Sequence, residues 1–409
     1  MSASGRLPRV LAAFLLLAAA HAPARAVFIA QEMDALDTEP LFDSEYFLDL
    51  LGFAPPLDWR WDWLASSGGY PANGASLDRS DLLWEADLRF SRKLGERFGF
   101  RYDLRRRGDK DLDALHQWLS LEARTWHGLT LGVFGEPEFA KENADLGLLA
   151  RWEAGPWTLA ASRNAVDFNF NERGRSTQSY PRKPTTYEFA ASRLSGLGRV
   201  SAACELDAPL ERSVPASNRL YAYRRTRAAL RWDRVPAPGG RGWGAGYSID
   251  LKRESDAFSP DPSAQSLSSR RAVHELSLAG TGPINARDSI EAGGRFLKRS
   301  AQVETPSAPL ESSEHRRWEF APYARWRRTL GPWAVSELGA FLSYGEIRRR
   351  FPSDPSRGWS QKPLEAKLGA GIDLLSGRSG RVGLYAHFDL DDLGRHLWDG
   401  GNIRAMFLF

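Results

Sequence analysis

Arginine recurs at alternate positions in three stretches of this sequence, and this pattern has the clearest chemical meaning. The residues are Arg225, Arg227, Arg231, Arg295, Arg299, Arg325 and Arg327. A guanidinium group is planar and always charged, and it binds both oxygens of a carboxylate, sulfate or phosphate. Because side chains two residues apart on a strand point to the same face, each stretch would present its arginines to one side of a sheet. The pattern predicts binding of anionic groups.

Acidic residues occur on the same predicted face of the sheet. They are Glu291, Glu319, Glu337 and Glu365. Opposite charges on adjacent strands stabilise a sheet by pairing, so a balanced wall neutralises itself. Two interpretations are therefore open: the arginines attract a passing anion, or they form ion pairs that hold the wall together.

Catalytic chemistry has little support in the sequence. His387 and Asp389 alternate on one predicted strand, as a base and its orienting carboxylate would, but no serine motif accompanies them. The other histidines lack the spacing typical of zinc or haem ligands. Cys204 is the single cysteine and falls among apolar positions. We therefore predict no enzyme activity, no metal site and no cofactor.

The elements that must position the charged residues are strands, because apolar and polar residues alternate with a period of two from Leu57 onward. The first predicted strand has Trp59, Trp61 and Trp63 on one face. Other clear examples are the stretches 146–153, 290–296, 318–327, 364–374 and 382–389. Alternation also occurs in soluble sandwiches, where one face of each sheet is solvated. Here nearly every polar face carries charge, which favours the lumen of a membrane barrel.

The connections between these stretches alternate in length. Short ones include Ala154–Pro156, Ser195–Gly198 and Thr329–Pro332. Long polar ones include Ser66–Ser80, Asp207–Asn218 and Gly345–Pro363. Short periplasmic turns and long extracellular loops are typical of outer-membrane barrels.

Tryptophan residues bracket the short turns. They are Trp126, Trp152, Trp157, Trp232, Trp243, Trp326 and Trp333. An indole has an apolar body and a polar N–H, so it belongs at a lipid–water boundary. In a soluble sandwich these residues would cover the ends of the core, but their position among the apolar residues favours a periplasmic girdle.

The two ends of the chain predict export to an outer membrane. Residues 1–26 combine a basic segment, the apolar run Val10–Ala20 and the small residues Ala24 and Ala26, which is the pattern of a signal peptide cleaved after Ala26. Residues 27–56 are expected to form a periplasmic segment, either unstructured or with a short helix. The final strand has apolar residues at alternate positions, namely Ile403, Ala405, Phe407 and Phe409.

From Leu57 to Phe409 the chain resembles porin-class outer-membrane barrels, which end on such a strand and carry an assembly signal there. The resemblance implies an all-β, transmembrane, antiparallel up-and-down β-barrel of about 18 strands, or about 16 if the first hairpin lies outside the wall. It is architectural, so it assigns no specific functional residues. It implies passive diffusion of small hydrophilic solutes, with anionic solutes as one option. An occluded barrel that acts as a binding or assembly module, and an exporter of an anionic polymer, are the alternatives.

Composition limits the partners. The chain has 55 basic and 51 acidic side chains, and removing the three arginines of residues 1–26 leaves 52 against 51. A neutral exported chain is not expected to bind nucleic acid. The expected partners are outer-membrane lipid and lipopolysaccharide, the barrel-assembly machinery and small solutes, while a homo-oligomer remains open. Arginine clusters at 105–107, 270–271, 316–317 and 348–350 mark predicted outer ends, where lipopolysaccharide phosphates or water would surround them.

The last two strands also yield a prediction of register. Gly369, Gly371 and Gly383 lie on the predicted lumen face near Tyr385. If the intervening turn is centred near Arg378, Tyr385 falls opposite Gly371. Its ring would then cover glycine backbone and fix the pairing of the two strands.

Removing Phe409, or replacing it with aspartate, is expected to leave the protein unassembled in the periplasm. The assembly signal would be lost, and a charge would lie on the lipid-facing side of the closing strand. Folded barrels change their mobility on gels when heated, so heat-modifiable mobility of membrane fractions measures the effect. A variant that reached the outer membrane at normal levels would contradict the role given to Phe409.

Overall fold

The computed structural model describes residues 72–78, 82–108, 113–135, 144–168, 184–214, 219–234, 240–258, 267–306, 308–362, 364–376, 380–390 and 398–407. The predicted signal peptide, periplasmic segment and first strand at Trp59, Trp61 and Trp63 lie outside these residues, as does Phe409. Within them, no helix has the length and apolar composition needed to cross a bilayer, which says nothing of crossing by strands.

Strands dominate the described structure. They are β1 (Ala72–Asp78), β2 (Leu82–Leu94), β3 (Phe98–Gly108), β4 (Asp113–Arg124), β5 (Leu129–Gly135), β6 (Ala144–Ala154), β7 (Trp157–Phe168), β8 (Thr186–Ser195), β9 (Gly198–Asp207), β10 (Leu210–Val214), β11 (Arg219–Arg234), β12 (Gly242–Phe258), β13 (Leu267–Pro283), β14 (Asp288–Glu304), β15 (Ser313–Gly331), β16 (Ala334–Arg350), β17 (Trp359–Gln361), β18 (Leu364–Ser376), β19 (Gly380–Asp389) and β20 (Trp398–Phe407). Two short 3₁₀ turns, Pro309–Glu311 and Pro355–Arg357, interrupt the connections that follow β14 and β16.

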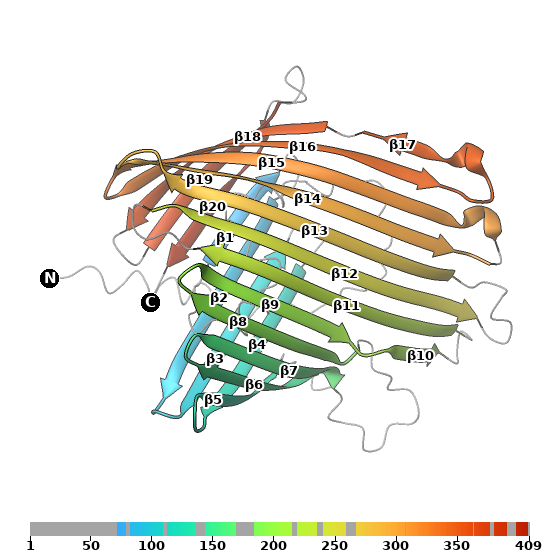
Figure 1. Cartoon of the computed structure of the whole chain (residues 1–409), viewed down its shortest axis with the longest axis horizontal. Coiled ribbons are helices and arrows are strands. Elements are labelled where there is room, and N and C mark those ends of the chain that lie inside the picture. Colours follow the sequence, from blue (N-terminus) through green and yellow to red (C-terminus); the bar gives the residue numbers. More distant parts are fainter. Residues whose placement is uncertain are drawn as a thin grey trace.

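The strands form one antiparallel sheet that closes on itself. Each wall strand pairs with the strands before and after it in the chain, and β20 pairs with both β19 and β1. Figure 1 shows the long strands β11–β16 lying side by side. Because β9 and β10 both pair with β11, and β17 and β18 both pair with β16, the 20 strands fill 18 wall positions. The predicted all-β, up-and-down barrel of about 18 strands is confirmed.

The two faces of the wall differ in chemistry. The outer face exposes large apolar side chains, for example Leu148, Leu230 and Phe320. The inner face carries charged groups, many of them buried, such as Glu205 and Arg299. The apolar outer face suits lipid, and a closed ring leaves no unpaired edge in the hydrocarbon layer. For described side chains, the predicted faces of 146–153, 290–296 and 318–327 are confirmed.

Three predicted long loops contain strands, and those predictions were wrong. β1 lies within Ser66–Ser80, β10 within Asp207–Asn218 and β17 within Gly345–Pro363. β1 pairs with both β20 and β2, so it fills the first wall position that the sequence assigned to the Trp59 stretch. These strands were missed because they are short and carry little apolar alternation, and β10 also follows Pro209, which cannot donate a backbone hydrogen bond to the sheet.

Tyr385 confirms the predicted register of the last hairpins. Tyr385 is the cross-strand partner of Gly371, and its ring occupies the space that a side chain at Gly371 or Gly383 would need. The side chain is only 6% exposed, and its hydroxyl donates to Asp373 Oδ1 at 2.5 Å. The same arrangement recurs where Phe134 faces Gly147 and Tyr323 faces Gly293. Inner-face aromatics thus cover glycine backbone at several places in the wall.

Replacing Gly371 with valine is expected to destabilise the barrel by about 1–3 kcal/mol, because the added carbons would displace the Tyr385 ring. Urea unfolding in detergent micelles measures the loss. Gly280→Val on the outer face is a matched control, since a Cβ there meets only the Ala292 carbonyl at 4.0 Å. Equal losses in the two variants would contradict the role of the Tyr385 ring.

Candidate functional site

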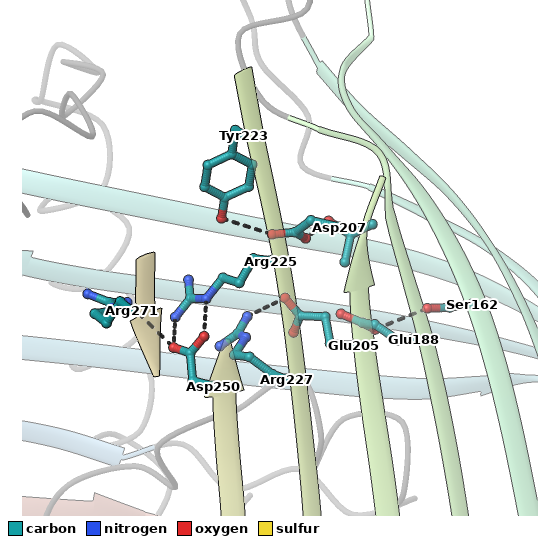
Figure 2. A network of polar contacts seen from close by, with 10 residues as sticks. Ser162, Glu188, Glu205, Asp207, Tyr223, Arg225, Arg227, Asp250 and Arg271 are labelled. Atoms are coloured by element: carbon teal, nitrogen blue, oxygen red, sulfur yellow. Dashed lines mark hydrogen bonds and ion pairs between the residues drawn. The ribbon is translucent and has the colours of Figure 1, made fainter. Parts of the chain in front are cut away.

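The inner face of β11, β12 and β13 carries a chain of ion pairs. Arg225 on β11 binds Asp250 on β12 through two bonds, Nε to Oδ1 at 2.9 Å and Nη2 to Oδ2 at 2.5 Å. Arg271 on β13 approaches the same carboxylate, with Nη2 3.5 Å from Oδ2. Figure 2 shows the three side chains converging from neighbouring strands. Asp250 therefore lies between two arginines, and the charges alternate across the wall.

Acidic side chains gather on the adjoining inner face of β8 and β9. Glu188 and Glu205 are buried cross-strand neighbours, and Asp207 lies two residues beyond Glu205 (Figure 2). Ser162 donates to Glu188 Oε2 at 3.0 Å, and Tyr223 donates to Asp207 Oδ2 at 3.0 Å. These hydrogen bonds from hydroxyl groups offset part of the free-energy cost of removing the carboxylates from water.

Arg227 joins the acidic and basic parts of this network. Its guanidinium contacts Glu205, and both are shown in Figure 2. One carboxylate oxygen of Glu205 thus accepts from an arginine of the neighbouring strand β11. Arginines of β11 thus neutralise carboxylates on both β9 and β12, whereas Glu188 and Glu205 place like charges directly opposite each other.

A second network spans β13 to β16. Arg295 Nε donates to Glu275 Oε1 at 2.6 Å, and Arg325 contacts both Glu291 and Glu337. Arg327 Nε donates to Glu337 Oε2 at 2.7 Å. Glu337 therefore bridges two arginines of β15, much as Asp250 does between β11 and β13.

The remaining arginines and acids predicted to matter occupy several settings. Glu319 is 1% exposed and contacts Arg317 of its own strand, while Arg299 is buried. Arg231 lies near the girdle end of β11, beside Trp232. It donates to Asp233 at 2.8 Å and its side chain is largely exposed. The side chain of Glu365 lies outside the described part. In every described pair the arginine meets an acid, which favours the interpretation that these residues hold the wall.

The acidic partners themselves were missed from the sequence. They are Glu188, Glu205, Asp207, Asp250 and Glu275. Glu205, Asp250 and Glu275 lie on strands that pair with an arginine-bearing strand, whereas Glu188 and Asp207 accept from hydroxyl groups. Correct strand pairing, which the sequence does not provide for β8, β9 and β12, would have identified them.

An apolar cluster on the inner face of β4–β7 was also missed. Trp118, Phe134, Leu149 and Ala160 are buried together, and the rings of Trp118 and Phe134 stack with centroids 5.1 Å apart. Ser120 and Asn164 beside this cluster are each 1% exposed. The described inner wall over β4–β7 thus combines this packed cluster with an ion pair, in which Arg151 Nη2 donates to Glu122 Oε2 at 2.8 Å.

The predicted girdle residues lie near the turns at one end of the barrel. Trp152 and Trp157 bracket the β6–β7 turn, and Trp152 Nε1 donates to the His127 carbonyl at 3.2 Å. Trp232 and Trp243 contact each other edge to face, with ring centroids 4.0 Å apart. Trp126 and Trp333 lie in turns and are well exposed, and Trp326 lies on the outer face of β15. This position at one end of an apolar wall is what an interfacial girdle requires.

Other chemistry-bearing residues are scattered. Cys204 lies on the outer face of β9, between Phe189 and Ala228. No cluster of three or more His, Cys, Asp or Glu able to hold a metal occurs among the described residues. The side chains of His387, Asp389 and Arg105–Arg107 lie outside the described part. The backbone of Ile403, Ala405 and Phe407 belongs to β20, which pairs with β1 and β19.

Comparisons with known proteins add an architectural likeness. No protein-family model and no curated protein matches the chain. Among solved structures, OmpT of Vibrio cholerae has 10% sequence identity and a TM-score of 0.39, and the alignment covers 83% of this chain and 96% of that one.

Pseudomonas aeruginosa OccK11 (OpdR) has 12% identity and a TM-score of 0.40, over 83% of this chain and 96% of that one. A mutant of the Rh. blastica porin has 9% identity and a TM-score of 0.32, over 83% and 98%. At these scores the likeness supports no inference about solutes, and the fold rests on the strand pairing of this chain. In architecture the chain is similar to porin-like outer-membrane β-barrels.

Proposed function

We propose that this chain is an outer-membrane channel for passive diffusion of small hydrophilic solutes. One observation carries the proposal: 18 wall positions close into a ring whose outer face is apolar and whose inner face is charged. Barrels of 16 to 18 strands enclose an interior wide enough for an aqueous channel. The apolar outer face supports placement in a lipid bilayer, with the tryptophan-flanked turns on the periplasmic side.

The arrangement of charges on the inner face affects which solutes the proposed channel would select. Arg225, Arg227 and Arg325 each contact a carboxylate, so the wall presents both signs of charge at close range. Paired charges produce a weaker long-range field than an unbroken row of one sign. The proposed channel therefore admits anionic solutes without strong selection for them. An exporter of an anionic polymer would need a continuous arginine wall, and acids interrupt the described arginines.

One observation favours an occluded barrel as a second candidate. Trp118, Phe134, Ser120 and Asn164 on the inner face are nearly inaccessible to solvent. The inner wall of a wide water-filled channel would leave such side chains in contact with water. An occluded barrel would act through its outer loops or a periplasmic partner, as a binding or assembly module.

Liposome swelling distinguishes the two candidates. Purified protein is reconstituted into vesicles that are diluted into isotonic solutions of uncharged sugars of increasing mass. The channel proposal expects swelling rates that fall as the sugar grows, because a pore sieves by size. Vesicles reconstituted with heat-denatured protein provide the control. Correctly folded protein that gave no swelling with the smallest sugar would overturn the channel proposal in favour of the occluded barrel.

A further inference from the structure

Three arginines lie side by side on the outer face of the barrel. Arg224 on β11 is the direct cross-strand partner of Arg253 on β12, and Arg253 is the direct partner of Arg270 on β13. All three side chains are exposed. Like charges directly opposite each other destabilise a sheet. This row therefore needs an explanation that the inner-face ion pairs do not provide.

The row has no acidic partner in the part of the chain that the structure describes. No ion pair to Arg224, Arg253 or Arg270 occurs among the described side chains, in contrast to Arg225 and Arg271 on the opposite face. Two described acids lie diagonal to the ends of the row on the same face, namely Glu211 on β10 beside Arg224 and Glu304 on β14 beside Arg270, and neither forms an ion pair with the row. Glu304 accepts from Gln302 Nε2 at 2.9 Å and from Ser268 Oγ at 3.4 Å.

Two other outer-face arginines, one on β15 and one on β16, do have acidic partners. Arg316 donates to Glu314 at 3.4 Å, and Arg348 donates to Glu346 at 2.7 Å. These two residues are neutralised by acids on the same face. The predicted clusters at 270–271 and 316–317 therefore split, because only Arg270 and Arg316 face outward while Arg271 and Arg317 face the interior. Arg224 and Arg253 were not singled out from the sequence.

The height of the row matches the edge of a bilayer. Trp243, at the girdle end of β12, and Arg253 are on the same face, and the outer-face residues between them include Tyr247 and Leu251. Ten residues of strand span about 33 Å. With the usual tilt of such strands this corresponds to roughly 25 Å of depth, which is the height of the apolar band in these barrels.

We infer that Arg224, Arg253 and Arg270 bind the phosphate groups of a phosphorylated glycolipid in the outer leaflet. Neighbouring strands are about 4.8 Å apart, so adjacent guanidinium groups can share one phosphate. Each guanidinium offers paired donors to phosphate oxygens. The acyl chains would lie on the apolar face below, against Leu251 and Tyr247. The lipid phosphate supplies the negative charge that the row otherwise lacks.

This inference is independent of whether the lumen conducts. It requires only that the barrel lies in a membrane with the row at its outer edge. A barrel that fails to conduct can still bind the glycolipid, and a conducting barrel can fail to bind it. The swelling assay and the lipid assay therefore fail separately.

The test compares unfolding of purified protein in neutral detergent with three additives. These are a diphosphorylated glycolipid of the lipid A type, the same glycolipid with its phosphates removed, and inorganic phosphate alone. Heat-modifiable mobility on gels gives the unfolding temperature. The variant is R224Q/R253Q/R270Q. The control is R199Q/R234Q/R287Q, which removes the same charge from exposed positions near the opposite end.

We expect the diphosphorylated glycolipid to raise the unfolding temperature of the wild type and the control, and to have no effect on the R224Q/R253Q/R270Q variant. The dephosphorylated glycolipid should have no effect on any of them. An equal rise in all proteins would overturn the inference, and so would a rise with inorganic phosphate alone, since the ligand would then be the free ion. If the triple variant does not fold, Arg253→Gln at the centre of the row replaces it, with at least half of the temperature shift expected to be lost.

Discussion

Replacing Glu337 with glutamine is expected to destabilise the folded barrel by about 3 kcal/mol, because a buried carboxylate that serves two arginines would be lost. Glu337 is buried, contacts Arg325 and accepts from Arg327 Nε at 2.7 Å. The substitution keeps the shape of the side chain and removes only its charge. Arg327 would then lose the carboxylate that neutralises it. Urea unfolding of purified protein in micelles measures the difference.

A matched substitution at an exposed pair separates burial from charge. Glu314 lies 3.4 Å from Arg316, and that arginine is mostly exposed. Glu314→Gln should cost under about 1 kcal/mol, as exposed ion pairs usually do. Adding Arg327→Gln to Glu337→Gln should restore part of the lost stability, because the unpaired charge is removed. Equal losses at Glu337 and Glu314 would show that the inner-face network does not hold the wall.

Replacing Arg227, Arg295 and Arg325 together with glutamine is expected to move the reversal potential in a salt gradient toward cation preference. These residues contact Glu205, Glu275 and Glu291, respectively. Removing three positive charges leaves those carboxylates to dominate the local field of the lumen. The shift should be larger at low ionic strength, because the Debye length falls to about 3 Å in 1 M salt.

The acidic partners provide the opposite control. Glu205, Glu275 and Glu291 are replaced with glutamine in a second triple variant, which should shift the reversal potential toward anions. Both variants are first checked for heat-modifiable mobility, so that only folded barrels are compared. Unchanged selectivity in both would show that these pairs belong to the wall and do not face the path of ions.

Much of the fold could be predicted because the alternation of side chains is enforced by the bilayer. The outer faces of β14, β15 and β18 follow directly from apolar residues at every second position. The pairing of Gly371 with Tyr385 followed from a single short turn, since two strands joined by few residues have little freedom of register. Both predictions depend only on local sequence.

Strands with weak alternation could not be predicted. β1 has the sequence Ala-Asn-Gly-Ala-Ser-Leu-Asp, with one large apolar residue, and it is a strand because β2 and β20 satisfy its backbone. β10 follows Pro209 and continues the wall beyond the break at the end of β9. In both cases tertiary hydrogen bonding overrides a composition typical of loops.

The candidate site could be predicted only in part, because the face on which a side chain lies is a local property whereas its ion-pair partner depends on the register between strands. Arg225 and Arg327 could be placed on the inner face by parity, but their partners Asp250 and Glu337 required the register between strands. The packed cluster of Trp118, Phe134 and Leu149 gave no signal, because apolar residues on both faces of a strand resemble an ordinary buried strand.

Single-channel recording in planar bilayers tests the central claim most directly. Purified, folded protein is added to one side of a bilayer in 1 M potassium chloride, and the current is recorded at fixed voltage. The proposed channel predicts stepwise increases of uniform conductance, which are absent with the heat-denatured protein. Folded protein that inserts into the bilayer without any current step would contradict the claim that this barrel is an open channel.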